Sequence, residues 1–370
     1  MKFKFYPKES KLYDFLRFPR LLFYKEAYEE FKKDSNFSRL NIDEYLDFVK
    51  KVEDRLKPFI VDFDMFYAKP FLNDYNFIDL ITRTETTFGY NDEKEFLDSL
   101  LNLTEDETNK NIISSLILIN EEHEMYSEKI EKQAEKISSS KDKMVSFIKD
   151  LPIDSGLKWN LFLMIEEPIK YTEKYVELML KILPIFYEFY RPLNDRVLEY
   201  GNYLVDYLNT EGPKGLGELT DSVIDSKIID TEEVNILVSV VFSYAISLLP
   251  RGKESYIAWG LKMEDAFRQM KEINENKTNE RVHIFKNLGD KTRYEVLKLI
   301  ASGETSTKII AETLGVSSAT ISYHINNFLT SKVIKMDKID NKYGYVVDYE
   351  LLNRTLEEFK EDLRFPQKNS

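Results

Sequence analysis

Small, hydrogen-bonding side chains gather on one face of a segment near the C-terminus, residues 317–329 of a 370-residue chain. Ile321, Ile325 and Leu329 recur at i, i+4 and i+8, which predicts one buried stripe of a helix. The other positions of this helix, which we expect to face outward, are Ser318, Ala319, Thr320, Ser322 and Tyr323. A helix that enters the major groove needs such a thin face, with hydroxyls that reach base edges. The segment therefore predicts contact with double-stranded DNA.

A shorter helix is expected just before this one. Ile309, Ile310 and Leu314 supply its apolar side. Gly315 follows where the helix must end, because a left-handed C-terminal cap favours glycine. Ser317 then stands at the N-cap of the next helix, where its hydroxyl can accept a hydrogen bond from an otherwise unpaired backbone N–H. The two helices and the tight turn between them predict a helix-turn-helix.

A β-hairpin is predicted directly after the second helix. Val333 to Ile339 and Tyr343 to Val347 are rich in β-branched and aromatic residues, as strands are. The tripeptide Asp340-Asn341-Lys342 between them is a turn-forming sequence. Lys338 and Lys342 would then lie at the hairpin tip, where cations suit the phosphate backbone beside the groove.

Residues Glu280 to Leu363 resemble the winged helix-turn-helix of the ArsR family of bacterial repressors. The resemblance rests on the opening LGDKTRYEVLKLI, the recognition-helix pattern SSATISYHI and the hairpin wing. It implies a transcriptional regulator that binds an operator as a homodimer, most simply as a repressor. The resemblance and the pattern of the predicted helix and hairpin together indicate eight DNA-binding residues. These are Ser317, Ser318, Thr320, Ser322, Tyr323, His324, Lys338 and Lys342.

Several residues of this module have a packing role as an open alternative. His324 caps or packs as readily as it contacts DNA, and Tyr323 either stacks on the nucleic acid or lies along its own helix. Lys291 and Arg293 pair with a carboxylate or contact a phosphate. The last helix, residues 349–363, carries an apolar stripe that serves packing or, as the equivalent region does in the family, dimerisation. That stripe consists of Leu352, Leu356, Phe359 and Leu363.

The chain departs from the metal-sensing members of that family. Those members hold soft ions with cysteine thiolates, whereas this protein has no cysteine, which excludes thiolate sensing and a thiol redox switch. Its three histidines, His123, His283 and His324, form no His-x-x-x-His pair. The sequence Glu121-Glu122-His123-Glu124 is better explained as a solvated acidic helix face than as a metal site. We expect neither a metal nor another cofactor.

Charge separates the chain into two parts of different character. Residues 280–350 hold ten Lys and Arg against nine Asp and Glu, a balance of +1, and residues 351–370 balance at zero. Because the net charge of the chain is −13, the first 279 residues carry −14. Such an acidic region repels DNA. We therefore expect DNA binding by the C-terminal module alone, and its weak positive charge favours action as a dimer.

Length and pattern predict two domains. Residues 1–279 are expected to form an acidic, mostly helical sensor or oligomerisation domain, and residues 280–370 the winged helix-turn-helix. The fold class is then mainly α with a small antiparallel β part, at about 222–261, where period-two segments replace the helical pattern. Gly212 to Glu218 lacks the order of a P-loop and is predicted to be a linker, and Pro184 is expected to kink or break its helix. Helices are expected over Leu21–Lys33, Asp43–Leu56, Glu93–Leu103, Glu107–Lys136, Lys141–Leu151, Leu157–Phe189, Pro192–Leu208 and Glu264–Asn276, and strands over Ser222–Ile229, Val234–Leu249 and Tyr256–Leu261.

No segment predicts export or membrane insertion. The opening MKFKFYPKESKLYDFL lacks an apolar region and a small-residue cleavage site. The segment most like a membrane span, the uncharged stretch Val234 to Leu249, is only 16 residues long, against the roughly 20 that a spanning helix requires. We expect a cytoplasmic protein with no membrane partner.

The function of the N-terminal part is less well defined by its residues. Its many aromatics between residues 171 and 207 could line a pocket for a small-molecule effector, although ordinary helical core is the better explanation. No nucleophile-and-base set or cofactor fingerprint is present, so we do not expect an enzyme. The favoured function is a DNA-binding regulator whose N-terminal domain senses a ligand or sets dimer geometry. The alternative is an N-terminal enzyme or protein-interaction module whose winged helix serves protein contacts, and the near-neutral charge of that module favours it.

Overall fold

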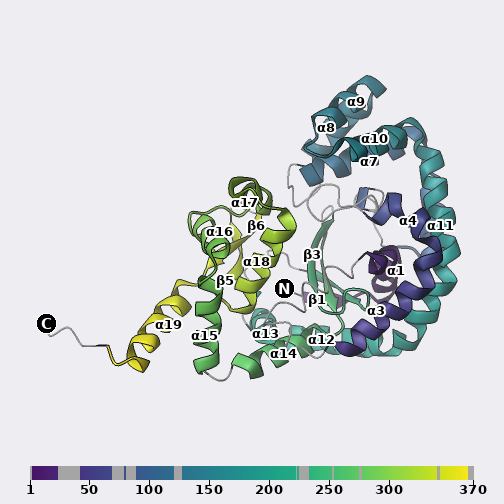
Figure 1. Cartoon of the computed structure of the whole chain (residues 1–370). Helices are drawn as coiled ribbons and strands as arrows, with labels where there is room; N and C mark the ends of the chain where they lie inside the picture. The colour runs from purple at the N-terminus through teal and green to yellow at the C-terminus, as the bar shows by residue number, and fades with distance from the viewer. Residues whose placement is uncertain are drawn as a thin grey trace. The chain divides into compact units, whose positions relative to one another are not determined.

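The computed structural model describes residues 2–23, 42–68, 79–80, 89–120, 127–221, 223–224, 233–251, 254–274, 277–339 and 342–365 (Figure 1). Its α-helices are α1 (Pro7–Arg17), α3 (Asp43–Leu56), α4 (Ile60–Phe63), α6 (Glu93–Leu101), α7 (Glu105–Asn120), α8 (Glu128–Ser138), α9 (Lys141–Asp150), α10 (Ser155–Glu166), α11 (Pro168–Tyr190), α12 (Asn194–Glu211), α13 (Pro213–Leu219), α14 (Met263–Asn274), α15 (Lys277–Leu288), α16 (Lys291–Ala301), α17 (Thr307–Leu314), α18 (Ser318–Thr330) and α19 (Tyr349–Asp362). Short helical turns of other types are η1 (Phe18–Leu22), η3 (Lys57–Phe59), η4 (Asp64–Ala68) and η5 (Arg191–Leu193). The strands are β1 (Lys2–Phe5), β2 (Glu233–Ser239), β3 (Ile246–Arg251), β4 (Glu254–Gly260), β5 (Ile334–Ile339) and β6 (Lys342–Val347).

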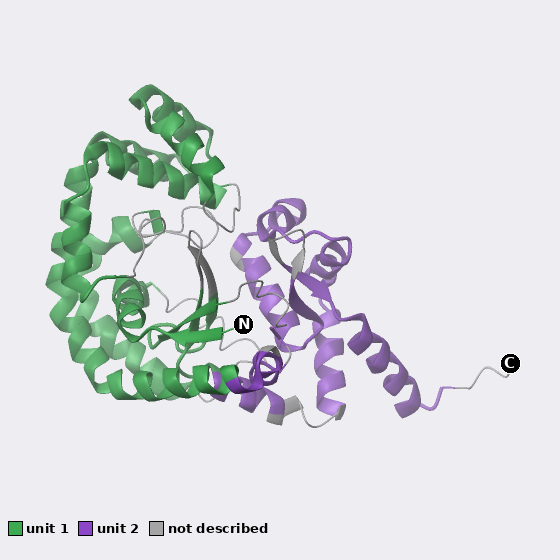
Figure 2. Cartoon of the chain, turned by 180° about the vertical axis from the view of Figure 1, so that it is seen from behind, with its two compact units in different colours: residues 1–30, 41–209, 231–263 green, residues 31–40, 210–230, 264–370 purple. Residues whose placement is uncertain are grey.

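The chain divides into two compact units (Figure 2). Unit 1 comprises residues 1–30, 41–209 and 231–263, and unit 2 comprises residues 31–40, 210–230 and 264–370. Unit 2 thus contains α13 and nearly all of α14, whereas the two domains predicted from the sequence divide at 279/280. The assignment of sensing and DNA-binding roles to separate domains stays a prediction.

Unit 1 contains a four-stranded sheet in the order β1-β2-β4-β3. β3 pairs antiparallel with β4, in keeping with the predicted mainly α fold with a small antiparallel β part. Two pairings are parallel, β1 with β2 and β2 with β4, and these were not expected. The predicted segment Val234–Leu249 proves to be two strands, β2 and β3, joined through residues 240–245. That turn fits against Gly260, where a Cβ would lie 2.3 Å from the Ser243 carbonyl oxygen, so glycine is required there.

β3 ends at Arg251, two residues beyond the predicted strand end at Leu249. Pro250 and Arg251 belong to β3, and the register pairs Arg251 with Glu254. β3 lies at the edge of the sheet, where a proline without an N–H is tolerated. Gly252 and Lys253 lie outside the described residues.

A buried carboxylate ties α1 to the end of β2. Asp14 is fully buried and accepts hydrogen bonds from the Ser239 hydroxyl, from Val240 N (2.8 Å) and from Val241 N (3.4 Å). Burial raises the pKa of the Asp14 carboxyl to about 7, because loss of water disfavours its charged form more than these donors favour it. The first helix is thus attached to the sheet through a group that titrates near neutral pH.

Most of the predicted helices in unit 1 are present. α3 has its predicted span, whereas the predicted helix Leu157–Phe189 consists of two helices, α10 and α11, of which the second begins at Pro168. The predicted break at Pro184 is wrong, because α11 continues through it to Tyr190. Leu183 and Phe186 beside the proline are buried, so packing on one face holds the helix together. None of the described helices is both long and apolar enough to cross a membrane.

Other predictions for unit 1 concern residues at or beyond the limits of the described ranges. The predicted helix Leu21–Lys33 lies outside them from residue 24 onward. Residues 121–126, with the proposed acidic face around His123, also lie outside them.

The aromatics expected to line a pocket or fill the core include four buried residues, which therefore belong to the core. These are Tyr171, Tyr175, Phe186 and Tyr190.

The predicted linker at Gly212 to Glu218 is wrong, because most of it forms helix α13 in unit 2. Pro213 occupies the first turn of this helix, where its missing N–H has no cost. Leu216 and Leu219 are buried, and their packing outweighs the low helix propensity of the glycines. Of the predicted strand Ser222–Ile229, only Val223 and Ile224 are described, and Ile224 forms a β-bridge with Met336.

Candidate nucleic-acid interface

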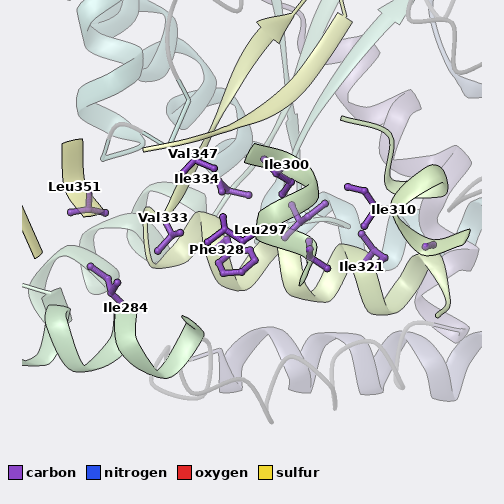
Figure 3. Close-up of a cluster of buried hydrophobic side chains, with 13 residues drawn as sticks. Ile284, Leu297, Ile300, Ile310, Ile321, Phe328, Val333, Ile334, Val347 and Leu351 are labelled. Atoms are coloured by element: carbon purple, nitrogen blue, oxygen red, sulfur yellow. The ribbon is translucent and has the colours of Figure 1, made fainter. Parts of the chain in front are cut away.

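One hydrophobic cluster holds the C-terminal module of unit 2 together (Figure 3). Its side chains come from five helices, α15 to α19, and from the hairpin β5–β6 with the residue before it. They are Ile284, Val296, Leu297, Ile300, Ile310, Ala311, Ile321, Ile325, Phe328, Val333, Ile334, Val347 and Leu351. Because helices and hairpin share this core, the outer faces of α18 and of the hairpin are held on one body.

The turn between α17 and α18 is built as the sequence predicted. The Ser306 hydroxyl accepts a hydrogen bond from Ile309 N (3.2 Å) at the start of α17. Gly315 ends this helix in the left-handed conformation, with φ +65° and ψ 32°. The Ser317 hydroxyl accepts from Thr320 N (3.1 Å) and caps α18. Each cap satisfies backbone groups that a helix end leaves unpaired.

Two apolar positions of the helix-turn-helix differ from the prediction. Ile321, Ile325 and Phe328 form the buried stripe of α18, while Leu329 is only partly buried against the same cluster. The stripe therefore follows i, i+4, i+7, and the third member was misassigned by one residue. Ile309, expected on the apolar side of α17, is 47 % exposed.

The outer face of α18 carries most of the predicted contact residues. Ser317 is exposed at its N-terminus, and the partly exposed residues that follow are Ser318, Thr320, Ser322 and Tyr323. The hydroxyl oxygens of Ser317 and Thr320 lie 2.8 Å apart, so the cap orients both. These five residues lie together on one helix; their contact with DNA stays a prediction.

His324 lies inside the module rather than on its outer face. It is 8 % exposed, and its Nδ1 has no hydrogen-bond partner among the described residues. Burial is the main cause that lowers the pKa of His324, with Asp290 opposing the shift and Arg293 adding to it. An enclosed imidazole with a lowered pKa is a poor ligand for phosphate. The structure thus favours the packing alternative for His324 over the predicted DNA contact.

A polar network that the sequence analysis did not predict joins α15, α16 and α18. The Arg293 guanidinium donates to Asn287 Oδ1 (2.7 Å), and its Nε lies 3.8 Å from Asp290 Oδ1. Asn287 is buried and donates in turn to the Asn327 carbonyl oxygen (3.4 Å). Of the two alternatives for Arg293, the ion pair with a carboxylate is present, and a phosphate contact of this residue stays a prediction. The one sequence signal of this network was the opening that contains Asp290, Thr292 and Arg293.

The predicted hairpin wing is present as β5 and β6. Its register pairs Lys338 with Tyr343 and Ile339 with Lys342. Lys342 is therefore the first residue of β6, and the predicted three-residue turn is wrong because the ladder extends one residue further toward the tip. Asp340 and Asn341, which remain for the turn, lie outside the described residues. Both lysines occupy the strand ends next to the tip, where phosphate contact was predicted.

The last helix packs against α15 and leaves apolar residues on its surface. Arg281 forms ion pairs with Glu358 (2.7 Å) and Asp362 (2.6 Å). The rings of Phe285 and Phe359 lie 4.9 Å apart between centroids. Of the predicted stripe, Phe359 and Leu352 thus contact the module, whereas Leu356 and Leu363 are exposed.

These features define a winged helix-turn-helix, a class of module whose second helix suits the major groove. Comparison with known proteins agrees with this geometry: the model of a family described as a helix-turn-helix domain matches residues 288–336. The match covers α16, α17, α18 and the start of the wing. No curated protein and no solved structure matches the chain. The helix-turn-helix domain suggests a DNA-binding regulator.

Proposed function

We propose that the protein is a sequence-specific transcription regulator of the ArsR type, which represses by binding an operator as a homodimer. The observation that carries the proposal is the outer face of α18, where hydroxyl-bearing residues are held by a capped helix with a packed inner face. Serine and threonine hydroxyls donate and accept hydrogen bonds, so they suit base edges and phosphates. Lys338 and Lys342 at the end of the wing would add phosphate contacts.

The surface of α19 supports the homodimer. Tyr349, Leu356 and Leu363 are 59 %, 47 % and 58 % exposed, and they lie seven residues apart. They form one exposed apolar line along α19, because Leu352 and Phe359 between them pack against the module, and such a line suits contact with the same surface of a second copy. Two copies joined in this way would present two recognition helices, which suits half-sites about 34 Å apart. A dimer would also offset the weak positive charge of one module.

We propose that unit 1 senses a small molecule and is not an enzyme. A groove of about 620 Å³ runs along α11, with leucine and proline side chains on its walls. Lys94 and Arg191 add two exposed cations to it, while the charge of Glu188 is offset by Arg55 at 2.9 Å. Apolar walls with excess positive charge suit an amphipathic anion. Such a ligand would change the affinity for DNA only by as much as its own affinities for the DNA-bound and the DNA-free protein differ.

The experiment that tests DNA binding is fluorescence anisotropy with the DNA upstream of the protein's own coding sequence, across a salt series. An unrelated duplex of equal length is the control. Selective binding that weakens as salt rises is expected, because lysines displace counterions from phosphates. The same assay also tests ligand sensing, with decanoate as the amphipathic anion and decanol as its uncharged control. Decanoate should change the affinity for DNA, and decanol should not. Arg191→Gln should lose this response to decanoate, whereas Lys181→Gln, outside the groove, should retain it.

Equal binding of both duplexes at low salt would overturn the proposal. The near-neutral charge of the module favours one other function, in which the winged helix serves protein contacts. The N-terminal part would then be an enzyme or an interaction module.

A further inference from the structure

A short segment far from the wing in sequence runs beside the wing in space. Ile224 forms a parallel β-bridge with Met336 of β5, and the Met336 N–H donates to the Val223 carbonyl oxygen (3.4 Å). Ile224 is buried at this contact. All three residues belong to unit 2, so the contact lies within one compact body.

An ion pair closes the same contact at the base of the wing. Lys332, two residues before β5, pairs with Asp221. Both residues have positive φ, +58° and +50° respectively, a conformation that ordinarily favours glycine or asparagine. The mutual attraction of two partly buried charges helps to hold the backbone in this conformation on both sides of the contact.

The segment is itself firmly held by α13. Thr220 is fully buried, its hydroxyl donates to the Leu216 carbonyl oxygen (2.8 Å), and its oxygen accepts from Ile224 N (3.1 Å). The described residues of this segment, Thr220, Asp221, Val223 and Ile224, are thus held at the end of α13, and Val223 and Ile224 contact β5.

The wing needs a partner of this kind. β5 pairs with β6 along one edge, and its other edge would present unpaired N–H and C=O groups to water. The base of the hairpin packs in the module core through Val333, Ile334 and Val347, and the bridge to Ile224 adds a contact nearer the tip. The bridge at Met336 occupies the middle of β5, so it restrains the strand that leads to the tip.

We propose that the segment that holds Thr220, Asp221, Val223 and Ile224 positions the wing for its contact with DNA phosphates, a role that rests on the proposed DNA binding of the module. The segment follows α12 and α13 in the chain and precedes β2, a strand of unit 1. In this role the segment sets affinity through the phosphate backbone, while α18 sets sequence preference.

The test uses the full chain with Asp221→Asn and, separately, Lys332→Gln. Asp265→Asn is the matched control, because it removes a carboxylate that pairs with Arg268 at 2.6 Å on α14 of the same unit. The first readout is deuterium exchange at the Met336 amide. The second is the salt dependence of binding to the upstream DNA and to the unrelated duplex.

Exchange at Met336 should rise about tenfold in both variants, since its hydrogen bond to Val223 opens more often. The plot of log affinity against log salt concentration should become less steep by roughly 1 to 2. This is the contribution expected from phosphate contacts of the two wing lysines, Lys338 and Lys342. The ratio of affinities for the two duplexes should stay within about twofold, because α18 is untouched. A general loss of folding would instead change this ratio and the exchange of α18 amides.

Unchanged Met336 exchange together with an unchanged salt slope would overturn the inference, and so would loss of sequence preference at an unchanged slope. If the unaltered protein binds no DNA, the proposed function fails. Under that outcome the wing-positioning role for DNA fails with it, whereas faster Met336 exchange in the variants would still establish the support of β5 by Val223 and Ile224.

Discussion

Asp14→Asn should remove a pH dependence from the stability of unit 1. The pKa of the Asp14 carboxyl is raised from 3.8 to about 7 in the folded protein. Below pH 3.8 the carboxyl is protonated in both states, so it contributes no pH dependence. Between the two values the unfolded chain loses the proton and the folded protein keeps it, so stability must fall as pH rises.

The size of this fall follows from the shift. Each pKa unit corresponds to about 1.4 kcal/mol, so a shift of about three units gives roughly 4 kcal/mol in all. The free energy of unfolding should decrease by about 1.4 kcal/mol per pH unit between roughly pH 4.5 and 6.5, and level off above 7. Asparagine keeps an oxygen for the Val240 N–H and cannot ionise, so the variant should lack this slope.

The assay is urea denaturation followed by tryptophan fluorescence at a series of pH values. Both tryptophans of the chain, Trp159 and Trp259, belong to unit 1, so their signal reports this unit. Trp259 is fully buried, and its indole N–H donates to the Tyr200 hydroxyl (2.9 Å), so unfolding exposes it to water. Asp98→Asn, at an exposed position of α6, is the control for the loss of one carboxyl.

The difference between Asp14→Asn and the unaltered protein is the decisive quantity. If the two stability curves run parallel from pH 4.5 to 6.5, the folded protein holds Asp14 ionised and the argument from burial is wrong. If Asp98→Asn removes the slope as well, the pH dependence comes from net charge and not from Asp14.

Three further changes test the DNA-binding module. Gly315→Ala forces a Cβ into the left-handed region and should lower the stability of the module by about 1 kcal/mol, measured by calorimetry; an unchanged melting transition would contradict the helix-end geometry. Phe328→Ala removes a fully buried ring and should cost about 3–5 kcal/mol while the tryptophan signal of unit 1 keeps its midpoint; equal shifts in both would show that the units unfold together. Thr320→Arg, or deletion of residues 340–342, should abolish or retarget DNA binding in the anisotropy assay and leave the circular dichroism spectrum unchanged. Unaltered binding by both variants would refute the assignment of recognition helix and wing.

The parts of the site that could be predicted from the sequence are those with local causes. Gly315 ends a helix and Ser317 starts one because of their own conformational and hydrogen-bonding properties. The helix-turn-helix could therefore be predicted from the sequence. The choice between Phe328 and Leu329 for the core was not, because neighbouring apolar residues differ only in which side of the helix meets the rest of the module. Burial of His324 likewise depends on the start of α16, where Asp290 and Arg293 lie near its ring.

The parts that could not be predicted join residues distant in sequence. β1 has four residues, and its partner β2 begins more than two hundred residues later, so no local pattern indicates the pairing. Val223 and Ile224 resembled the start of a strand, yet their partner is Met336 in the wing. Packing likewise overrides propensity in α13, where Leu216 and Leu219 hold a glycine-rich helix.

The pairing of β1 with β2 has a consequence for folding of the chain during its synthesis. The first strand leaves the ribosome long before its neighbour, and at about 5–20 residues per second it waits on the order of 10 to 50 seconds for residues 233–236 to be made. During that interval the apolar Phe3 has no sheet to join, so the nascent chain depends on its early helices, or on a chaperone, to keep this strand from other chains. The winged helix, built from contacts among its last ninety or so residues, is under no such delay and can fold as soon as it emerges.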